Sequence, residues 1–263
     1  MDLGIKDKVA LVTASSSGLG KAAALQLSRE GAKVAICARN GEKLLKAKDA
    51  IIGETASVVK AYPADVTKTD QIKGLVESTA ADLGPVDILV CNAGGPPPGQ
   101  WDDFGPDDYR EAVELNLMST INLCYEVIPY MREKNWGRII CIVSISAKQP
   151  IKNLILSNTA RAGVLGFAKS FSDQIAPYGI TVNSVCPGYT MTERVENLAK
   201  SFAESGKGTI EDFYRNAEAE IPMKRIGTTE EFGQTVAFLA SEGAGYITGT
   251  ALQIDGGYIK GLF

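Results

Sequence analysis

Residues 13–20 form a serine- and glycine-rich stretch, Thr-Ala-Ser-Ser-Ser-Gly-Leu-Gly, whose composition suits the binding of a phosphate group. An apolar run at residues 9–12, typical of a strand buried in a parallel sheet, precedes it, and a helical pattern at residues 21–30 follows. A strand, turn and helix in this order direct backbone N–H groups and the positive end of the helix dipole at one position. A turn that only caps the helix has the same pattern, so this stretch alone leaves both interpretations open.

Arg39 favours the nucleotide-binding interpretation and indicates which nucleotide is bound. A second apolar run, residues 34–37, follows within the length of one strand–helix–strand unit, and Arg39 stands just beyond it. In dinucleotide-binding folds an acidic residue near this place binds the ribose 2′-hydroxyl, whereas an arginine accommodates a 2′-phosphate. Residues 36–40 contain no carboxylate. We therefore predict that the protein binds NADP(H) in preference to NAD(H).

The composition excludes several classes of protein. A chain of 263 residues is long enough for one large α/β domain with a substantial core. The formal net charge is -4 and no basic cluster occurs, which argues against a nucleic-acid partner. Residues 1–8 carry four charged side chains, and no apolar run approaches membrane-spanning length. We expect a soluble, cytoplasmic protein without a membrane partner.

Cysteine and histidine usage limits the chemistry further. No two of the five cysteines form a CxxC pair, and each lies in or beside an apolar run, so we expect buried free thiols in a reducing compartment. Histidine is absent, which excludes histidine-based acid–base catalysis and the usual zinc ligand sets. An acidic group near residue 106 either binds a cation or stabilises the start of a helix there, and we expect no metal site. The acidic group consists of Asp102, Asp103, Asp107 and Asp108.

Strand-like and helix-like segments alternate along the rest of the chain. The expected strands are residues 57–61, 86–90, 138–143, 180–185 and 251–254, and the expected helices are residues 41–53, 68–83, 106–134, 154–176 and 229–240. This order predicts an α/β fold with a doubly wound, seven-stranded parallel sheet that binds ligands at the carboxyl ends of its strands. Residues 192–221 are polar and helix-prone, and they form either a solvated helical hairpin or a lid over that edge.

The chain resembles the short-chain dehydrogenase/reductase family over nearly its full length, and it is closest to the 3-oxoacyl-(acyl carrier protein) reductase-like members. The family's glycine motif is matched at residues 13–20, although Ala14 replaces the first glycine. An alanine cannot adopt a positive φ cheaply. The resemblance implies one Rossmann domain over residues 1–263, with a substrate lid at about residues 192–221. The positions it implies for cofactor binding are Thr13, Ser15, Ser16, Ser17, Gly18, Leu19, Gly20, Arg39, Asp65, Val66, Asn92, Ala93, Gly94, Pro187, Gly188, Thr190 and Thr192.

The resemblance also identifies four catalytic positions, two of which depart from the family pattern. Ser144 and Asn116 match the family's serine and asparagine, but its tyrosine and lysine, four residues apart on a helix, correspond to Ser157 and Arg161. Residues with this spacing share one helix face, so the two side chains can still approach each other. A serine hydroxyl is a far weaker acid than a phenol, and an arginine effectively does not give up its proton.

Both altered residues therefore have two open interpretations, namely a catalytic role or a contact with the nucleotide. Two other residues are candidates for a substitute acid, Tyr189 beside Pro187 and Gly188, and Lys148 beyond Ser144. Either of these could instead face solvent.

Two functions are compatible with the sequence. The first is an NADP(H)-dependent oxidoreductase that transfers a hydride between nicotinamide and a small carbonyl or alcohol substrate, for which the family suggests a 3-oxoacyl thioester. The second is a redox-inactive NADP(H)-binding protein that regulates a partner, suggested by the changes at Ser157 and Arg161. The resemblance further implies a homo-oligomer, either a dimer or a tetramer.

Overall fold

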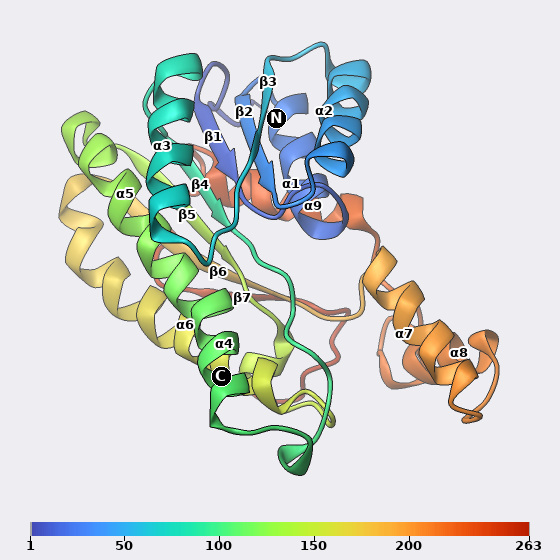
Figure 1. Ribbon diagram of the computed structural model, residues 1–263. Helices are drawn as coiled ribbons and strands as arrows, with labels where there is room; N and C mark the ends of the chain where they lie inside the picture. Colours follow the sequence, from blue (N-terminus) through green and yellow to red (C-terminus); the bar gives the residue numbers. More distant parts are fainter. Residues whose placement is uncertain (1, 263) are drawn as a thin grey trace.

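A computed structural model describes residues 2–262, which form a seven-stranded sheet with helices on both faces (Figure 1). All neighbouring strands are parallel, in the order β3-β2-β1-β4-β5-β6-β7. The order reverses between β1 and β4, which opens a crevice at the carboxyl ends of these strands. The predicted doubly wound parallel sheet is confirmed. The strands are β1 (Val9–Val12), β2 (Lys33–Ala38), β3 (Val59–Pro63), β4 (Ile88–Cys91), β5 (Gly137–Ile142), β6 (Ile180–Pro187) and β7 (Ala251–Ile254).

The helices divide between the two faces of the sheet. One face is covered by α1 (Gly18–Arg29), α2 (Gly41–Thr55) and α9 (Thr229–Ala240), and the other by α3 (Thr69–Leu83), α5 (Ser119–Lys134) and α6 (Ile155–Ile175). Each face has its own apolar cluster, so β1, β4, β5 and β6 are buried on both sides. This explains why these strands have continuous apolar runs in the sequence.

The cysteines are buried and free, as predicted. Cys91 on β4, Cys124 on α5 and Cys141 on β5 lie in one apolar cluster and are at most 2% exposed. Hydrogen bonding to Cys124 and Cys141, followed by desolvation, raises the pKa of Cys91. These thiols therefore serve as small apolar core residues.

The predicted helix over residues 106–134 is confirmed in its bounds, but it is not a regular α-helix throughout. The structure has α4 (Pro106–Val113), a π-helical turn (Glu114–Met118) and then α5. Asn116 lies in this turn, and its side-chain amide donates to the carbonyl of Gly94. A π turn accommodates one extra residue and is frequent at functional sites. The hydrophobic periodicity of residues 106–134 does not reveal the contact between Asn116 and Gly94, because Gly94 belongs to a distant segment after β4.

The acidic residues near residue 106 stabilise helix starts. The side chain of Asp108 accepts a hydrogen bond from the backbone N–H of Gly105 at 2.8 Å, and Asp103 accepts one from Gln100 at 2.7 Å. Within residues 2–262 no group of His, Cys, Asp or Glu side chains has an arrangement that could hold a metal ion. Of the two interpretations of this group, the structure supports the capping of helices.

The start of α3 differs slightly from the expectation. The helix begins at Thr69, one residue later than expected, and Lys68 is its capping residue. The hydroxyl of Thr67, just before it, donates to the carboxylate of Asp65 at 2.9 Å. The side chain of Thr67 thus fixes Asp65 in the turn after β3.

Two helices, α7 (Glu193–Glu204) and α8 (Ile210–Glu220), are inserted between β6 and α9 and project from the rest of the molecule (Figure 1). They form a helical hairpin whose aromatic rings pack together, with Phe202 and Phe213 at a centroid distance of 5.8 Å. Tyr189, just after β6, packs edge-on against Phe213 at 6.4 Å and joins the hairpin to the sheet. None of the helices within residues 2–262 combines the length and the apolar character that a bilayer crossing requires.

Candidate active site

The turn after β1 is held by buried hydroxyls on its inner side. Thr13 donates to the carbonyl of Asn92 at 2.7 Å, and Ser15 donates to the carbonyl of Val12 at 2.7 Å. Both side chains are fully buried. Thr13 and Ser15 therefore shape the turn and tie β1 to β4, while Ser17 is exposed and makes no side-chain cap at the start of α1.

Close backbone packing explains a glycine of this turn, and Ala14 adopts a strained left-handed backbone. A Cβ atom on Gly20 would lie 2.6 Å from the carbonyl oxygen of Ala14 and 2.7 Å from the amide nitrogen of Asn92, so only glycine fits. Gly18 has a φ of +57° and Ala14 a φ of +45°. A left-handed conformation costs about 1–2 kcal/mol for a residue with a Cβ atom. The replacement of the motif's first glycine by Ala14 therefore has the conformational cost expected from the sequence.

A cavity of about 750 Å³ lies at the carboxyl ends of β1, β4, β5 and β6, beneath the first turn of α7. It brings together most of the residues predicted for the cofactor and for catalysis. Of these residues, Ser17, Gly18, Leu19, Asn92, Ala93, Gly94, Ser144, Ser157, Arg161, Pro187, Gly188, Thr190 and Thr192 line it. The predicted residues outside its lining are Thr13, Ser15, Ser16, Gly20, Arg39, Asp65, Val66 and Asn116.

Arg39 and Asp65 lie beside each other at the ends of β2 and β3. The backbone N–H of Thr67 donates to Asp65, and this bond, with the charges of Arg39 and Lys68, holds the pKa of Asp65 below its usual value. Arg39 is exposed, and within residues 2–262 its guanidinium makes no hydrogen bond or ion pair. Its donors are thus available to a phosphate group, which a guanidinium binds well.

Ser144 follows β5 and begins a short turn. Its hydroxyl oxygen accepts the backbone N–H of Ser146 at 3.1 Å, which leaves its proton available for donation into the cavity. Ser157, in the first turn of α6, is buried and lies 3.5 Å from the hydroxyl of Ser146. Ser144, Ser146 and Ser157 are therefore linked by hydrogen bonds where β5 approaches α6.

Ser146 is a residue that the sequence reasoning missed. It is buried and links the other two serines, by its N–H to Ser144 and by its hydroxyl to Ser157. Its spacing of two residues from Ser144 was a signal, because a serine capping a short turn bonds the second N–H beyond it.

Arg161 lies one helical turn beyond Ser157 and faces the end of β5. Its Nη1 atom donates to the carbonyls of Val143 at 2.5 Å and Ile142 at 3.3 Å. Burial, followed by repulsion from Arg194, lowers the pKa of Arg161 to about 10. The guanidinium therefore remains charged at neutral pH and is fixed beside the residue that precedes Ser144.

Asn116 lies behind the wall of the cavity. Its amide donates to Gly94, which lines the cavity, at 3.0 Å, and its buried Oδ1 atom is without a hydrogen-bond partner among residues 2–262. Such an acceptor is normally satisfied by water or by a ligand. Leu117 packs against α6 where a Cβ on Gly163 would be only 2.9 Å from it, which fixes the π turn against this helix.

The two candidates for a substitute acid have different outcomes. Lys148 turns away from the cavity, since its ammonium donates to the carbonyl of Ala251 on β7 at 3.1 Å. Tyr189 lines the cavity, but its ring packs edge-on between Phe213 and Tyr258, and burial raises its pKa. Lys148 is therefore wrong as a proton donor, and a phenol with a raised pKa is poorly suited to the task.

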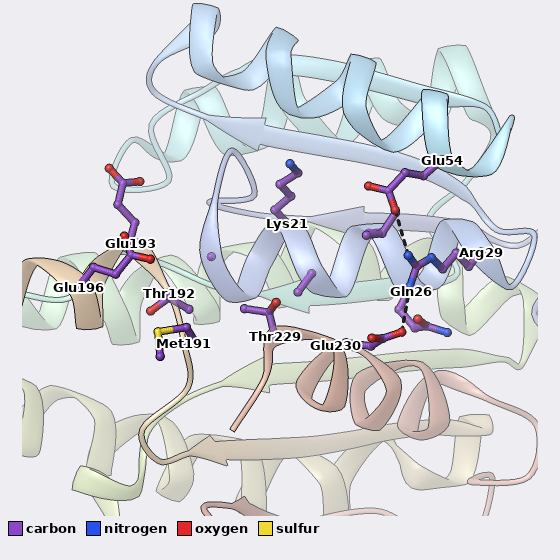
Figure 2. Close-up of a pocket in the computed structure, with 13 residues that line it drawn as sticks. Lys21, Gln26, Arg29, Glu54, Met191, Thr192, Glu193, Glu196, Thr229 and Glu230 are labelled. Carbon is purple, nitrogen blue, oxygen red and sulfur yellow. Dashed lines mark hydrogen bonds and ion pairs between the residues drawn. The ribbon is translucent and has the colours of Figure 1, made fainter. Parts of the chain in front are cut away.

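A second cavity, of about 430 Å³, lies on the outer side of α1 (Figure 2). Figure 2 shows that Arg29 joins its two walls, with ion pairs to Glu54 at 2.9 Å and to Glu230 at 3.3 Å. At this end of the cavity each charged group thus has a partner within the chain, although one guanidinium is shared by two carboxylates. The larger cavity is therefore the better candidate for an active site.

Comparisons with known proteins identify the family to which the chain belongs. The profile of the family described as enoyl-(acyl carrier protein) reductase matches residues 13–259. Nodulation protein G of Azospirillum brasilense is 36% identical over 257 residues, which cover 96% of this chain and 98% of that protein. The 3-oxoacyl-[acyl-carrier-protein] reductase of Haemophilus influenzae is 35% identical over 253 residues, covering 96% and 98%.

Solved structures show the same architecture. L-sorbose reductase from Gluconobacter frateurii, complexed with NADPH and L-sorbose, superimposes with a TM-score of 0.96 at 32% identity. The match covers 100% of this chain and 100% of that chain. A short-chain type dehydrogenase/reductase from Mycobacterium marinum has a TM-score of 0.89 at 31% identity, with 99% of this chain and 98% of that chain covered. With relatives above 30% identity along its whole length and the sheet order described above, the chain belongs to the short-chain dehydrogenase/reductase family of oxidoreductases.

Proposed function

We propose that the protein is an NADP(H)-dependent oxidoreductase that interconverts a carbonyl compound and its alcohol with an atypical catalytic set. One observation carries the proposal. Ser144, Ser157 and Arg161 line the same cavity as the glycine turn and the ends of β4 and β6. Polar groups suited to a carbonyl oxygen therefore lie beside residues suited to a dinucleotide.

The residues of the cavity fit the coenzyme. The first backbone N–H groups of α1 and the open turn around Gly18 suit a diphosphate, and Arg39 suits a 2′-phosphate. Thr190, Thr192 and the backbone of Asn92–Gly94 and Pro187–Gly188 would hold the remainder. When bound, the nicotinamide supplies or accepts the hydride. NADPH is named with two of the similar solved structures, L-sorbose reductase and actinorhodin polyketide ketoreductase, which supports the choice of cofactor.

The catalytic set departs from the family pattern at Ser157 and Arg161, in the positions of its tyrosine and lysine. A tyrosine and a lysine with the same spacing do occur on α5, at Tyr130 and Lys134. Lys134 forms an ion pair of 2.6 Å with Asp87, the residue before β4, and neither Tyr130 nor Lys134 lines the cavity. We therefore assign the site no phenol–lysine pair. Aliphatic hydroxyls and a fixed guanidinium stand in its place.

Ser144 would donate its proton as a hydrogen bond to the carbonyl oxygen, because its own oxygen is already engaged by Ser146. Arg161 would stabilise the negative charge that develops on this oxygen, as a fixed positive group in a partly dry site. A water bonded to Ser157 would deliver the proton and take up another from solvent, and Asn116 would act from behind the wall by fixing Gly94. Rates should be low, since a positioned general acid usually contributes about 10²- to 10⁴-fold.

Steady-state assays with NADPH and a panel of ketones, aldehydes and 3-oxoacyl thioesters test the proposal. We expect slow substrate-dependent oxidation of NADPH that is lost in S144A. A second function, a redox-inactive NADP(H) sensor, is favoured by the changes at Ser157 and Arg161. Tight NADPH binding with no oxidation above background across the panel would establish the sensor and exclude the enzyme.

A further substitution tests the geometry of the altered pair. If the cavity is otherwise intact, the double variant S157Y/R161K should raise carbonyl reduction on a generic substrate. An unchanged rate would show that the surrounding positions no longer support a phenol.

We also propose that the protein is cytoplasmic and forms a dimer or a tetramer. Tyr125 on α5 is 68% exposed and stacks on Phe171 of α6, which leaves aromatic surface on the outer face of these helices. Leu252 on the edge strand β7 is 37% exposed. Sedimentation of the purified protein would detect an assembly, and a monomer at all concentrations would exclude it.

A further inference from the structure

The large cavity carries an unbalanced positive charge. Arg161 and Arg194 both line it, and the only carboxylate among its lining residues is that of Glu193. The carboxylate of Glu193 lies 3.6 Å from the ammonium of Lys43, a residue that does not line the cavity. Lys43 therefore partly balances the charge of Glu193. A cleft with apolar walls and one sign of charge concentrates ligands of the opposite sign.

Arg194 stands where its own helix does not favour a cation. It is the second residue of α7, a helix of 12 residues, and the positive end of the helix dipole lies at this turn. A cation here costs stability unless an anion compensates it. Positions that break such local rules without a structural reason are often functional.

The guanidinium of Arg194 crosses the mouth of the cavity and rests on Gly95. A Cβ atom on Gly95 would lie 2.5 Å from Cζ and 2.6 Å from Nη2 of Arg194, so a glycine is required for this placement. Within residues 2–262 Arg194 makes no hydrogen bond or ion pair, and all of its donors are open. Arg161 lines the same cavity, and the charge of Arg194 contributes to the lowered pKa of Arg161.

The diphosphate of the coenzyme has donors elsewhere. The N-terminus of α1 and the serine turn supply backbone N–H groups for it, and Arg39 lies at the end of β2. Arg194 lies instead against Gly95, at the start of the proline loop, in a cavity whose lining also includes the apolar residues Ile151, Leu154 and Leu198. An apolar wall with one guanidinium at its edge suits an organic acid better than a sugar.

We propose that the substrate is an oxo acid, in which Arg194 binds the carboxylate while the carbonyl oxygen lies at Ser144. Because Arg161 is bonded to Val143, next to Ser144, its charge acts on both groups, and a short spacer between carboxylate and carbonyl is favoured. This inference rests on the proposed reductase activity and adds its substrate class. Arg194 is the residue that determines specificity.

The test compares a 3-oxo acid with its methyl ester, which differ only in the charged group. We expect wild type to prefer the acid in kcat/KM, and R194Q to lower the acid-to-ester ratio by about 10- to 100-fold, the value of a hydrogen bond to a charged group. Arg194 is exposed, so solvent screening places the effect toward the lower limit. R194K should restore part of the ratio, because it keeps the charge without the planar fork.

Arg215 provides the matched control. It lies on α8 of the same hairpin, is paired with Asp212 and does not line the cavity. R215Q should leave the acid-to-ester ratio and both rates as in wild type. A ratio that falls as much in R215Q as in R194Q would overturn the inference, since the effect would then be general to the hairpin.

Further outcomes separate this inference from the proposed function. Equal use of acid and ester by wild type overturns the oxo-acid inference and leaves the reductase intact. A loss of NADPH affinity in R194Q as large as the loss for the acid assigns Arg194 to the cofactor diphosphate and also overturns it. If neither compound is reduced, the reductase proposal fails, and calorimetry on NADPH-loaded protein decides the inference. Binding of the acid but not the ester, lost in R194Q, supports it, and equal binding overturns it.

Discussion

The two ends of the parallel sheet differ in how completely their polar groups are satisfied. At the amino end, the buried carboxylate of Asp87 binds Lys134 at 2.6 Å and the N–H of Val9 at 2.9 Å. The ring of Trp136 lies between the cations of Lys8, at 3.9 Å, and Arg138, at 4.3 Å. Each of these charges has a partner in the chain.

At the carboxyl end the same strands position groups that lack such partners. Among residues 2–262, Arg194 has no carboxylate partner and the buried Oδ1 atom of Asn116 accepts no hydrogen bond. The charged groups at the amino end are therefore paired within the chain, whereas Arg194 and Asn116 at the carboxyl end remain open to a ligand. Among the uncharged groups, the buried hydroxyl of Thr181 near the amino end of β6 is an exception, because it has no partner among residues 2–262. This difference separates residues that maintain the fold from residues that bind and react.

The largest expected effect is the loss of activity at the incomplete end. S144A should lower kcat/KM by about 10²- to 10³-fold, because it removes a donor to the developing oxyanion. The unfolding midpoint should stay close to that of wild type, since Ser144 makes only a short-turn cap. Steady-state kinetics and urea unfolding measure the two quantities. A variant that loses stability as well as activity would contradict the contrast between the two ends.

A buried charge at the satisfied end should show the opposite pattern. D87A removes a carboxylate that is 4% exposed and leaves the N–H of Val9 and the ammonium of Lys134 without it. We expect a loss of about 2–3 kcal/mol in the free energy of unfolding, reduced from the value of a fully buried pair because Lys134 is partly exposed. The KM values of the surviving enzyme should remain those of wild type. K134M is the matched comparison: it leaves the buried carboxylate of Asp87 without its cation and should therefore lose at least as much stability as D87A.

Arg39 tests the choice of coenzyme. R39A should weaken NADPH binding by about 10- to 100-fold, the cost of a hydrogen bond to a charged group. NADH lacks the 2′-phosphate, so its dissociation constant is the internal control and should change little. Fluorescence titration measures both constants. A wild-type protein that bound NADH more tightly than NADPH would refute the assignment of Arg39.

The strained backbone of Ala14 predicts a smaller, stabilising change. A14G should raise the free energy of unfolding by about 0.5–1 kcal/mol, because the relief of the left-handed conformation outweighs the added entropy of the unfolded glycine. Ala56, with a φ of +54° at the end of α2, provides a control remote from the cavity. A56G should stabilise by a similar amount, and only A14G should alter NADPH affinity. Denaturant unfolding and titration of both variants test this.

The pH dependence should be weak. The pKa of Arg161 is lowered to about 10, so its charge is present throughout the neutral range and is lost only as the pH rises through that value. Its desolvation cost is therefore constant below this pH and is relieved above it. With no histidine in the chain, kcat should vary little between about pH 6 and 9 and fall toward pH 10. A steep change near neutral pH would indicate another titrating group.

Much of the fold could be predicted from the sequence, because its strands are buried runs and its turns carry glycine. The bounds of β1, β7 and α9 agree with the expected ranges. The π turn at Asn116 could not be predicted, because it depends on a contact with Gly94 in another segment.

Residues of the site could be predicted only where they belong to local sequence motifs. The glycine turn, the ends of β4 and β6, and Ser144 are adjacent to strands, and the structure brings them to one cavity. Ser146 and Arg194 were missed, since their importance follows from the packing of α6 and α7 over the sheet. The orientation of Lys148 toward β7 could not be predicted from the sequence either. Side-chain direction in loops depends on neighbours that are distant in sequence.

The cysteine cluster in the core gives the molecule an internal reporter of its own opening. Cys91, Cys124 and Cys141 join two central strands to α5 and are closed to solvent, so an alkylating reagent can reach them only after that core separates. The rate of alkylation, followed by mass spectrometry, would then measure how often the native state opens globally. Every variant above could be ranked in this way without a denaturant and without an added probe.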